Sequence, residues 1–270
     1  MATDKPTVFI AGISSDIGRE LALLYAVRSN HVVGTFRKAV HVESLRGRSD
    51  IELISCDVSR PESIRSAADQ LATLNKRWDT FIGAVGQLDP IGPFFESDMD
   101  EWSASLTLNS IGQLRLLREI YPLRRRDTPA KVAFLVGGGI NGPFRNYSAY
   151  CLGKVMLVKA CELLHDEAPD VHAVAIGTGW VDTKIHRQTL EAGERAGENY
   201  RRTEEFLASG QTGTSCADIL ACIDWCFAQD RSVTGGRNFS VVHDAWKDEA
   251  GLGVALLRDP DKYKLRRGGN

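Results

Sequence analysis

Near its start the chain reads Val8-Phe9-Ile10-Ala11-Gly12-Ile13-Ser14-Ser15-Asp16-Ile17-Gly18, a strand-like apolar run that leads through a turn of small residues into a helix. The free backbone N–H groups of such a turn and the positive end of the helix can hold a pyrophosphate. The predicted phosphate-binding residues are Gly12, Ser14, Ser15, Ile17 and Gly18. Asp16 stands where a third glycine is expected, and we interpret its carboxylate as the helix cap. A turn of this kind can equally be purely structural, so other motifs have to decide.

Outward from this stretch, short β-branched runs alternate with helical patterns over most of the chain. The alternation predicts an α/β fold, a single doubly wound Rossmann-type domain whose seven-stranded parallel sheet has helices on both faces. The expected strands are Thr7–Gly12, Val32–Phe36, Glu52–Ser55, Thr80–Val85, Lys131–Val136, Val171–Ile176 and Asn238–Val242. The expected helices are Ile17–Arg28, Pro61–Lys76, Met99–Arg126, Ser148–Glu167 and Ser215–Gln229.

Two segments interrupt the alternation. We assign residues 1–244 to the domain, with a polar substrate lid at about 185–213, and residues 245–270 to a tail that packs on the same domain. Ligands of open α/β sheets bind outside the carboxyl ends of the strands, where the lid begins, so we expect the lid and the tail from Asp261 to Asn270 to cover the substrate. Their arginines predict an anionic substrate. These arginines are Arg187, Arg195, Arg201, Arg202, Arg266 and Arg267. The alternative is a solvated helical face, because glutamates nearly balance the cations.

Composition argues against several classes of function. The 270 residues carry a net charge of −2, without the Lys/Arg excess that binds nucleic acid. Apolar runs fall well short of the roughly 20 residues that span a bilayer, and Met1–Pro6 lacks a signal-peptide core, so we expect a cytoplasmic protein without membrane contact. The six cysteines show no CxxC spacing and the histidines no ligand spacing, which predicts reduced thiols and no metal site.

The end of the second strand bears on the choice of cofactor. NAD-selective sites place a carboxylate there, whereas this chain has the cations Arg37 and Lys38. A guanidinium binds a 2′-phosphate through a bidentate fork, so NADP(H) is favoured over NAD(H). A solvated pair of cations at a strand end is the alternative. Asp57, after the third strand, could face the adenine amino group or could simply start a turn.

Tyr150 and Lys154 lie at the start of an apolar helix, and their four-residue spacing puts both side chains on one face. A nearby ammonium stabilises a phenolate and lowers the pKa of the tyrosine, so the pair can exchange a proton with a substrate oxygen. Elsewhere, such a pair on a helix is usually solvent-exposed and has no catalytic role. Its position favours the catalytic interpretation, because this helix follows the fifth strand and the glycine turn follows the first.

With these residues in place, the chain resembles the short-chain dehydrogenase/reductase superfamily over nearly its whole length. The matching positions are Gly12 and Gly18, Asp57-Val58, the turn Gly83-Ala84-Val85-Gly86, Asn109, Tyr150 and Lys154, and Gly179-Trp180-Val181-Asp182-Thr183. The resemblance implies that Tyr150 is the proton donor, that Lys154 holds the nicotinamide ribose, and that Asn109 anchors a water relay. It also implies a cofactor site that includes Asp57, Val58, Val85, Gly86, Val181 and Thr183. Family members pack their long helices against a second subunit, which implies a homodimer or homotetramer.

The chain departs from the family pattern at several positions. Where the family has a serine 13 residues before the tyrosine, this chain has Gly137-Gly138-Gly139, which leaves no side-chain donor for the substrate carbonyl. Loss of one such donor typically costs about 10²–10³ in rate unless backbone N–H groups, Asn141 or Ser148 substitute. The turn at residues 83–86 lacks the usual asparagines, and Thr178 replaces the usual proline. The triple glycine and the last residues resemble a bacterial subset linked to surface polysaccharides and nucleotide sugars.

The function predicted from these features is an NADP-dependent oxidoreductase. It would transfer a hydride between the nicotinamide and the carbonyl or secondary alcohol carbon of a small molecule, which could be a nucleotide sugar, while Tyr150 handles the proton. One alternative is an epimerase or dehydratase that oxidises a sugar transiently. Another is a catalytically impaired NADP-binding regulatory protein, in which the triple glycine reflects lost catalysis.

Overall fold

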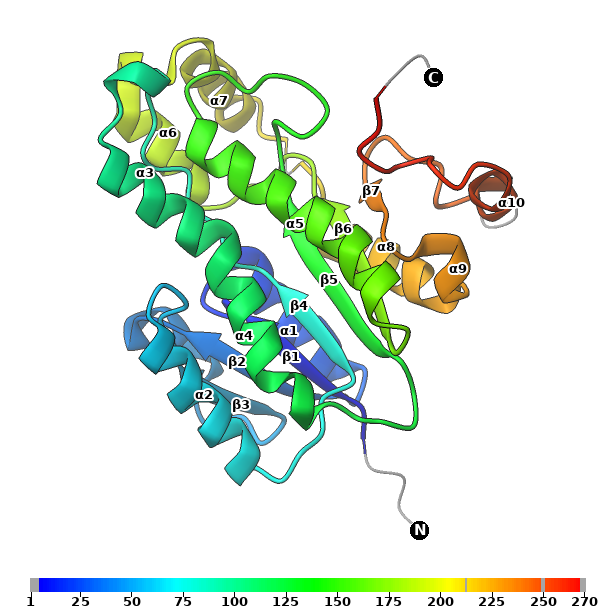
Figure 1. The fold of residues 1–270 in the computed structure, drawn as a ribbon. Helices are drawn as coiled ribbons and strands as arrows, with labels where there is room; N and C mark the ends of the chain where they lie inside the picture. The colour runs from blue at the N-terminus through cyan, green and yellow to red at the C-terminus, as the bar shows by residue number, and fades with distance from the viewer. Residues whose placement is uncertain (1–4, 212, 249–250, 268–270) are drawn as a thin grey trace.

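The computed structural model describes residues 5–211, 213–248 and 251–267 and contains one seven-stranded parallel sheet (Figure 1). The strand order is β3-β2-β1-β4-β5-β6-β7, and every pairing is parallel. The strands are β1 Thr7–Ala11, β2 His31–Phe36, β3 Ile51–Ser55, β4 Thr80–Gly83, β5 Ala130–Val136, β6 Val171–Gly177 and β7 Asn238–Ser240. The seven-stranded doubly wound sheet predicted from the sequence is confirmed.

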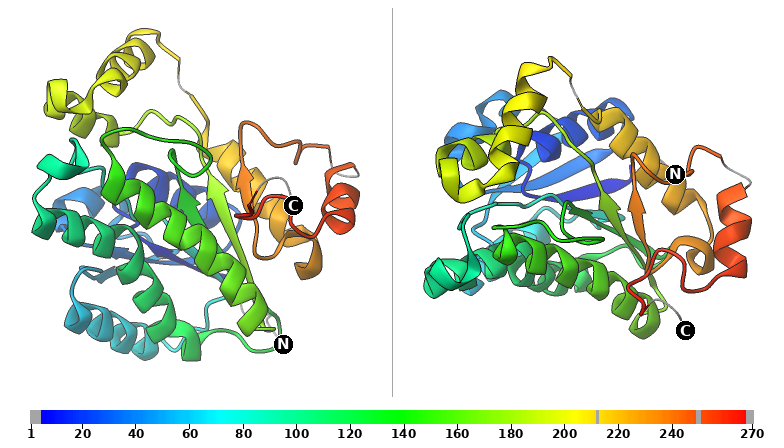
Figure 2. Two further views of the ribbon diagram at one scale, coloured as in Figure 1. Left: turned by 45° about the horizontal axis from the view of Figure 1, so that its top comes forward. Right: turned by 90° about the horizontal axis from the view of Figure 1, so that it is seen from above.

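Helices cover both faces of the sheet, as the view from above makes clear (Figure 2). Helices α1 and α8 pack on one face, where Leu21 and Ile219 join the core, and α2, α4 and α5 pack on the other. The α-helices are α1 Asp16–Val27, α2 Pro61–Thr73, α3 Met99–Leu106, α4 Gly112–Ile120, α5 Ser148–Glu167, α6 Ile185–Ala192, α7 Glu198–Ala208, α8 Cys216–Ala228, α9 Arg231–Thr234 and α10 Gly251–Arg258. Short turns of helix are η1 Ala39–Leu45, η2 Phe94–Glu96, η4 Tyr121–Leu123 and η5 Gly193–Ala196. Because both faces are covered, β1 is buried along its whole length, as its continuous apolar sequence requires.

The helix expected at Met99–Arg126 is not one regular helix. A π-helical segment, η3 Thr107–Ile111, separates α3 from α4, and the helical path ends at Leu123. The π segment contains the buried Asn109, and the α4 helix begins at Gly112, where a Cβ would lie 2.1 Å from the Val58 carbonyl oxygen. Such π segments are common at functional sites because they redirect side chains.

The two segments outside the alternating pattern leave the sheet in different directions. Residues 185–208 fold into α6, η5 and α7, and an antiparallel bridge between Val181 and Gly213 closes the base of this excursion. In Figure 1 these helices stand at the upper left, above the start of α5, whereas α10 and the tail lie at the right beside β7. Within the described ranges, no helix is long and apolar enough to cross a membrane. Residues 268–270, part of the tail named above, lie outside the described residues.

Candidate active site

A cavity of about 730 Å³ opens along the carboxyl edge of the sheet. Thirteen of the predicted site residues line it: Gly12, Ser14, Ser15, Ile17, Arg37, Asp57, Val58, Val85, Gly86, Tyr150, Lys154, Val181 and Thr183. Two do not, because Gly18 lies beneath the turn and Asn109 is fully buried behind the cavity. The topology therefore brings segments from the ends of all seven strands to one cavity.

The glycine turn after β1 is packed too closely for side chains at two positions. Gly12 has a φ of +84°, and a Cβ there would lie 2.9 Å from the Val85 side chain. A Cβ on Gly18 would lie 2.4 Å from the Gly12 carbonyl oxygen. The turn and the first residues of α1 thus form a bare backbone cradle, which is the geometry that a dinucleotide pyrophosphate requires.

Asp16 is not the helix cap that the sequence predicted. The N-cap is Ser15, whose hydroxyl accepts a hydrogen bond from the Gly18 N–H at 3.0 Å, and Asp16 is the first residue of α1. The Asp16 carboxylate lies at the cavity wall and accepts the backbone N–H of Lys184 at 2.7 Å. Ser15 is the cap because its backbone is extended and its hydroxyl reaches the N3 amide, whereas Asp16 is already inside the helix.

The cavity wall at the end of β2 carries two exposed cations. Arg37 and Lys38 follow β2 at the cavity wall. Asp57 also lines the wall, and its Oδ1 accepts the Ser59 N–H at 3.0 Å and the Ser59 hydroxyl at 2.6 Å. Burial raises the pKa of Asp57, but these hydrogen bonds and the charges of Arg37 and Arg60 lower it overall. Asp57 is therefore ionised at neutral pH and starts a turn as well as facing the cavity.

Tyr150 and Lys154 meet at the base of the cavity, one turn apart on α5. Tyr150 is 8% exposed and Lys154 4%, and the ammonium lies 5.7 Å from the centroid of the phenol ring. The ammonium donates hydrogen bonds to the carbonyl oxygens of Val85 at 2.9 Å and Leu135 at 3.0 Å. These carbonyls fix Lys154 between β4 and β5, so the predicted common face is present.

Burial governs the proton affinities of this pair. It raises the pKa of Tyr150 and lowers the pKa of Lys154 to about 7. The direction for Tyr150 is opposite to the one expected from the spacing, because desolvation of the buried phenol is the largest influence on its pKa. A strongly perturbed lysine in a cleft next to a tyrosine is typical of a functional site.

The triple glycine makes room for the phenol. A Cβ on Gly137 would lie 2.2 Å from the Tyr150 hydroxyl oxygen, so Tyr150 occupies the place of the side chain that would stand there. A Cβ on Gly138 would have Phe144 as its nearest neighbour, at 3.6 Å, and no close contact. The position of the Tyr150 hydroxyl therefore requires glycine at 137. The sequence pattern did not reveal this reason for the absence of the family serine.

Asn109 supports the cavity wall from behind. Its side chain accepts the Gln87 N–H at 3.0 Å and donates to the Gln87 carbonyl oxygen at 2.9 Å. The sequence reading missed Gln113, one turn along the helix, whose amide donates to the Asn109 carbonyl oxygen at 2.7 Å and to the Val85 carbonyl oxygen at 3.3 Å. A buried glutamine on the core side of an amphipathic helix was the available signal.

The excursion at 185–213 contributes apolar, amide, hydroxyl and imidazole side chains to the cavity wall. Gln188 Oε1 accepts the Leu88 N–H at 2.8 Å, and Thr189 Oγ1 accepts the Tyr147 hydroxyl at 2.9 Å. The cavity-lining residues that it contributes are Ile185, His186, Gln188, Thr189, Asn199 and Thr203. Its four arginines are absent from the lining, and Arg202 pairs with Glu198 on the exposed face of α7. The expectation that these arginines face the substrate is wrong, since the amphipathic helices turn them outward.

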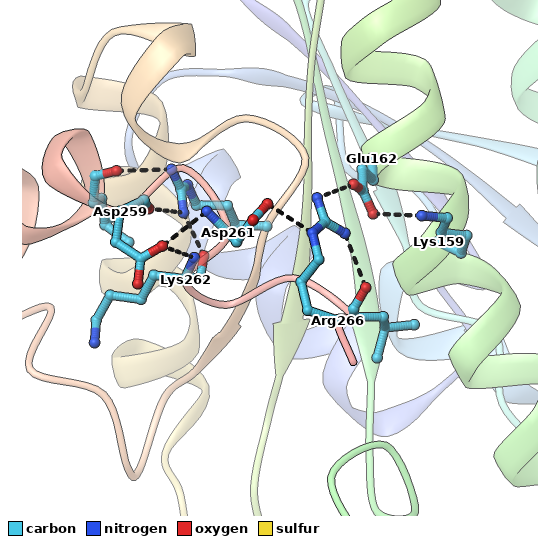
Figure 3. Close-up of polar contacts among 9 residues, drawn as sticks. Lys159, Glu162, Asp259, Asp261, Lys262 and Arg266 are labelled. Carbon is cyan, nitrogen blue, oxygen red and sulfur yellow. Dashed lines mark hydrogen bonds and ion pairs between the residues drawn. The ribbon is translucent and has the colours of Figure 1, made fainter. Parts of the chain in front are cut away.

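The expectation that the tail covers the substrate is also wrong for the part that the structure describes. Arg266 lies between Asp261 and Glu162, on the outer side of α5 (Figure 3). The Asn238 N–H donates to the Tyr263 carbonyl oxygen at 2.9 Å, which brings the tail to the start of β7. No residue of 251–267 lines the cavity. These contacts hold the tail at the amino end of β7, away from the carboxyl edge.

Comparison with known proteins agrees with this geometry. The family model for enoyl-(acyl carrier protein) reductase matches residues 12–235. Estradiol 17-beta-dehydrogenase 1 of Rattus norvegicus is 30% identical over 205 residues, which is 70% of this chain but 58% of the rat protein's length. The short chain dehydrogenase pigC of Monascus ruber is 24% identical over 265 residues, covering 92% of this chain and 84% of that protein.

Solved structures share the fold. The KRED1-Pglu enzyme superposes with a TM-score of 0.78 at 22% identity, covering 87% of this chain and 100% of the other. A short chain dehydrogenase from Shigella flexneri, solved in complex with NADP, has a TM-score of 0.71 at 19% identity and covers 88% of this chain and 97% of its own. With the family model spanning most of its length, this chain belongs to the short-chain dehydrogenase/reductase superfamily of oxidoreductases.

Proposed function

We propose that the protein is an NADP-dependent oxidoreductase acting on a carbonyl or secondary alcohol of a small molecule, with Tyr150 as the proton donor. The observation that carries this proposal is the meeting of three parts in one cavity. The glycine cradle at Gly12, the buried Lys154 and the Tyr150 phenol over Gly137 all line it. A regulatory nucleotide-binding protein would have no need of a phenol over a buried ammonium.

Each residue has a distinct task in this proposal. A bound nicotinamide supplies or accepts the hydride. Tyr150 holds the proton at its hydroxyl oxygen and gives it to the substrate oxygen during reduction. Lys154, fixed by two carbonyl oxygens, supplies the positive charge that favours the phenolate left behind. Asn109 acts as a positioning residue through Gln87, and the backbone of residues 137–139 is the available donor in place of the family serine.

The proposed preference for NADP(H) rests on the charge at the end of β2. Arg37 and Lys38 are exposed at the cavity wall, where a 2′-phosphate on the adenosine ribose would meet them. A bidentate guanidinium is the better phosphate ligand of the two.

The substrate half of the cavity favours an uncharged substrate over a nucleotide sugar. Leu88, Phe144 and Trp180 supply apolar surface there, and Gln188 and Thr189 supply amide and hydroxyl groups. We propose that residues 185–213 act as the substrate lid. Selectivity then comes from shape and a few hydrogen bonds, as in most small-molecule sites.

We further propose that copies of the chain pair through the outer faces of α4 and α5. Leu152 and Leu163 on α5 are 50% and 47% exposed, and Ile111, the last residue of η3 directly before α4, is 36% exposed. Exposed apolar residues along two neighbouring helices are typical of a subunit interface. Light scattering after gel filtration distinguishes a homodimer or homotetramer from a monomer.

The function is tested by measuring cofactor affinity and turnover together. Titration of protein fluorescence should give a lower Kd for NADPH than for NADH, and equal values would contradict the cofactor proposal. NADPH oxidation is then followed against ketones and aldehydes, and NADP+ reduction against estradiol, which the name of the rat relative suggests. Binding without turnover on the whole panel would favour a regulatory protein, and cofactor retained through purification would favour an epimerase or dehydratase.

A further inference from the structure

The glycine turn carries a negative charge at the place where a phosphate is expected to bind. Asp16 is the first residue of α1, beside the cradle formed by Gly12 and Gly18, and it lines the same cavity. Its side chain is 21% exposed. A carboxylate at this point repels an incoming pyrophosphate unless another charge compensates for it.

Two cations face that carboxylate. Asp16 Oδ1 lies 3.5 Å from the Arg19 guanidinium, one turn along α1, and 3.7 Å from the Lys184 ammonium. Lys184 comes from the opposite side of the cavity, directly after Thr183 and before the first residue of α6. Its backbone N–H also donates to Asp16 Oδ2 at 2.7 Å.

The Lys184 ammonium also contacts the turn itself. It donates a hydrogen bond to the Ser14 carbonyl oxygen at 3.0 Å, and Lys184 lines the cavity together with Ser14 and Ser15. The ammonium is therefore held on the cradle rather than directed into bulk solvent. A carbonyl and a carboxylate are both weaker partners for an ammonium than a dianionic pyrophosphate in the same place.

We propose that Lys184 is a further cofactor-binding residue, which supplies the positive charge that the pyrophosphate needs and offsets the Asp16 carboxylate. This inference rests on the proposed function. Asp16 and Lys184 act as a unit, because the acid by itself would weaken cofactor binding and the lysine, arriving from the far side of the cavity, cancels that effect. The same contact joins the first residue before the lid to the phosphate turn.

An ordinary surface ion pair would leave a different signature. The Lys184 side chain is 45% exposed, and pairs of this kind contribute little to stability. If Lys184 were only such a pair, its loss would not change the affinity for the cofactor. The two possibilities therefore separate in a binding measurement that does not depend on turnover.

The test is a double-mutant cycle on cofactor affinity. Kd values for NADPH and NADH are measured by fluorescence titration for the wild type, Lys184→Ala, Asp16→Asn and the double variant. Asparagine keeps an acceptor for the Lys184 N–H and removes only the charge. We expect Lys184→Ala to weaken binding about tenfold in the wild-type background and about threefold or less beside Asp16→Asn. The loss in the wild-type background should shrink as salt is added.

A matched control comes from Lys159, whose side chain is 48% exposed and pairs with Glu162 far from the cavity. Lys159→Ala should leave both Kd values unchanged. If the wild type binds NADPH and Lys184→Ala binds it with the same Kd, this inference is overturned but the proposed function is not. The same holds if Lys184→Ala weakens binding equally in the wild-type and Asp16→Asn backgrounds. If the wild-type protein bound neither dinucleotide, the proposed function itself would fall.

Discussion

The proposed lid at 185–213 and the tail at 251–267 are both additions beyond the sheet, and both are rich in charge, yet they end at opposite edges of it. The lid begins at the carboxyl end of β6 and stays there, because the bridge between Val181 and Gly213 returns the chain to its starting point. The tail begins beyond β7 and travels back, because Tyr263 receives the first N–H of that strand. Where a segment is anchored, and not its composition, decides whether it meets the cavity.

A buried cation lies beneath each region, and the two cations differ in kind. Lys154, 4% exposed, donates to carbonyl oxygens of β5 and the segment after β4. Arg237, 3% exposed, donates to the carbonyl oxygens of Leu256, Asp259 and Lys262, so it fixes the tail. A lysine can lose its proton near neutral pH, whereas an arginine stays charged. The first suits chemistry and the second suits a permanent structural anchor.

The largest effect is expected under the lid. Tyr150→Phe removes the hydroxyl that lies over Gly137 and should lower kcat by about 10²–10⁴, the usual contribution of a general acid. The Kd for NADPH should stay within about twofold, because the phenol acts on the substrate oxygen. Steady-state turnover and fluorescence titration measure the two quantities. Wild-type turnover in the variant would exclude Tyr150 as the proton donor.

Under the tail, the expected effect is on stability alone. Arg237→Met leaves three carbonyl oxygens of residues 256–262 without their donor, and it should lower the free energy of unfolding by about 3 kcal/mol. Chemical denaturation followed by circular dichroism measures this change. Arg266→Ala, which breaks the two partly exposed ion pairs with Asp261 and Glu162, should change it by less than about 1 kcal/mol. If the folded Arg237→Met protein had a changed Kd for NADPH, the conclusion that the tail acts independently of the cavity would be wrong.

The pH dependence sharpens the contrast between the two cations. Burial lowers the pKa of Lys154 to about 7, so its ammonium is present below pH 7 and is lost as the pH rises above it. The value of kcat/KM for NADPH reports the free enzyme, and it should fall about tenfold per pH unit above 7. Lys154→Arg keeps the charge and should remove this decline even if the rate is lower. An unchanged decline in that variant would assign the titration to another group.

The smallest expected effect concerns the hydrogen bond between Thr189 of the proposed lid and Tyr147, which directly precedes α5. Thr189→Val removes the acceptor of the buried Tyr147 hydroxyl and should raise the KM of the carbonyl substrate about three- to tenfold, with little change in kcat. Thr189→Ser retains the hydroxyl and should behave like the wild type. Initial-rate kinetics at saturating NADPH measure both. Equal KM values for all three proteins would show that the lid is held without this hydrogen bond.

Much of the part of the cavity that we propose binds the cofactor could be predicted from local sequence. The glycines at 12 and 18, the cations after β2 and the four-residue spacing of Tyr150 and Lys154 are short-range patterns, because backbone sterics and helix periodicity act over a few residues. The substrate half could not be predicted in this way. Its walls come from residues 88, 144, 180 and 188, which are far apart in the chain and meet only through the crossover connections of the sheet.

The sequence by itself determined the order of the seven strands along the chain, the glycine turn and the placement of Tyr150 and Lys154 on one helix face. Only the tertiary structure decided that Asp16 faces Lys184, that Gly137 makes room for the Tyr150 hydroxyl, and that lid and tail separate. The physical reason is the range of the interactions. Propensity, capping and periodicity are set by neighbours in sequence, whereas the compensation of a charge, the filling of a void and the anchoring of a segment depend on atoms that folding brings together.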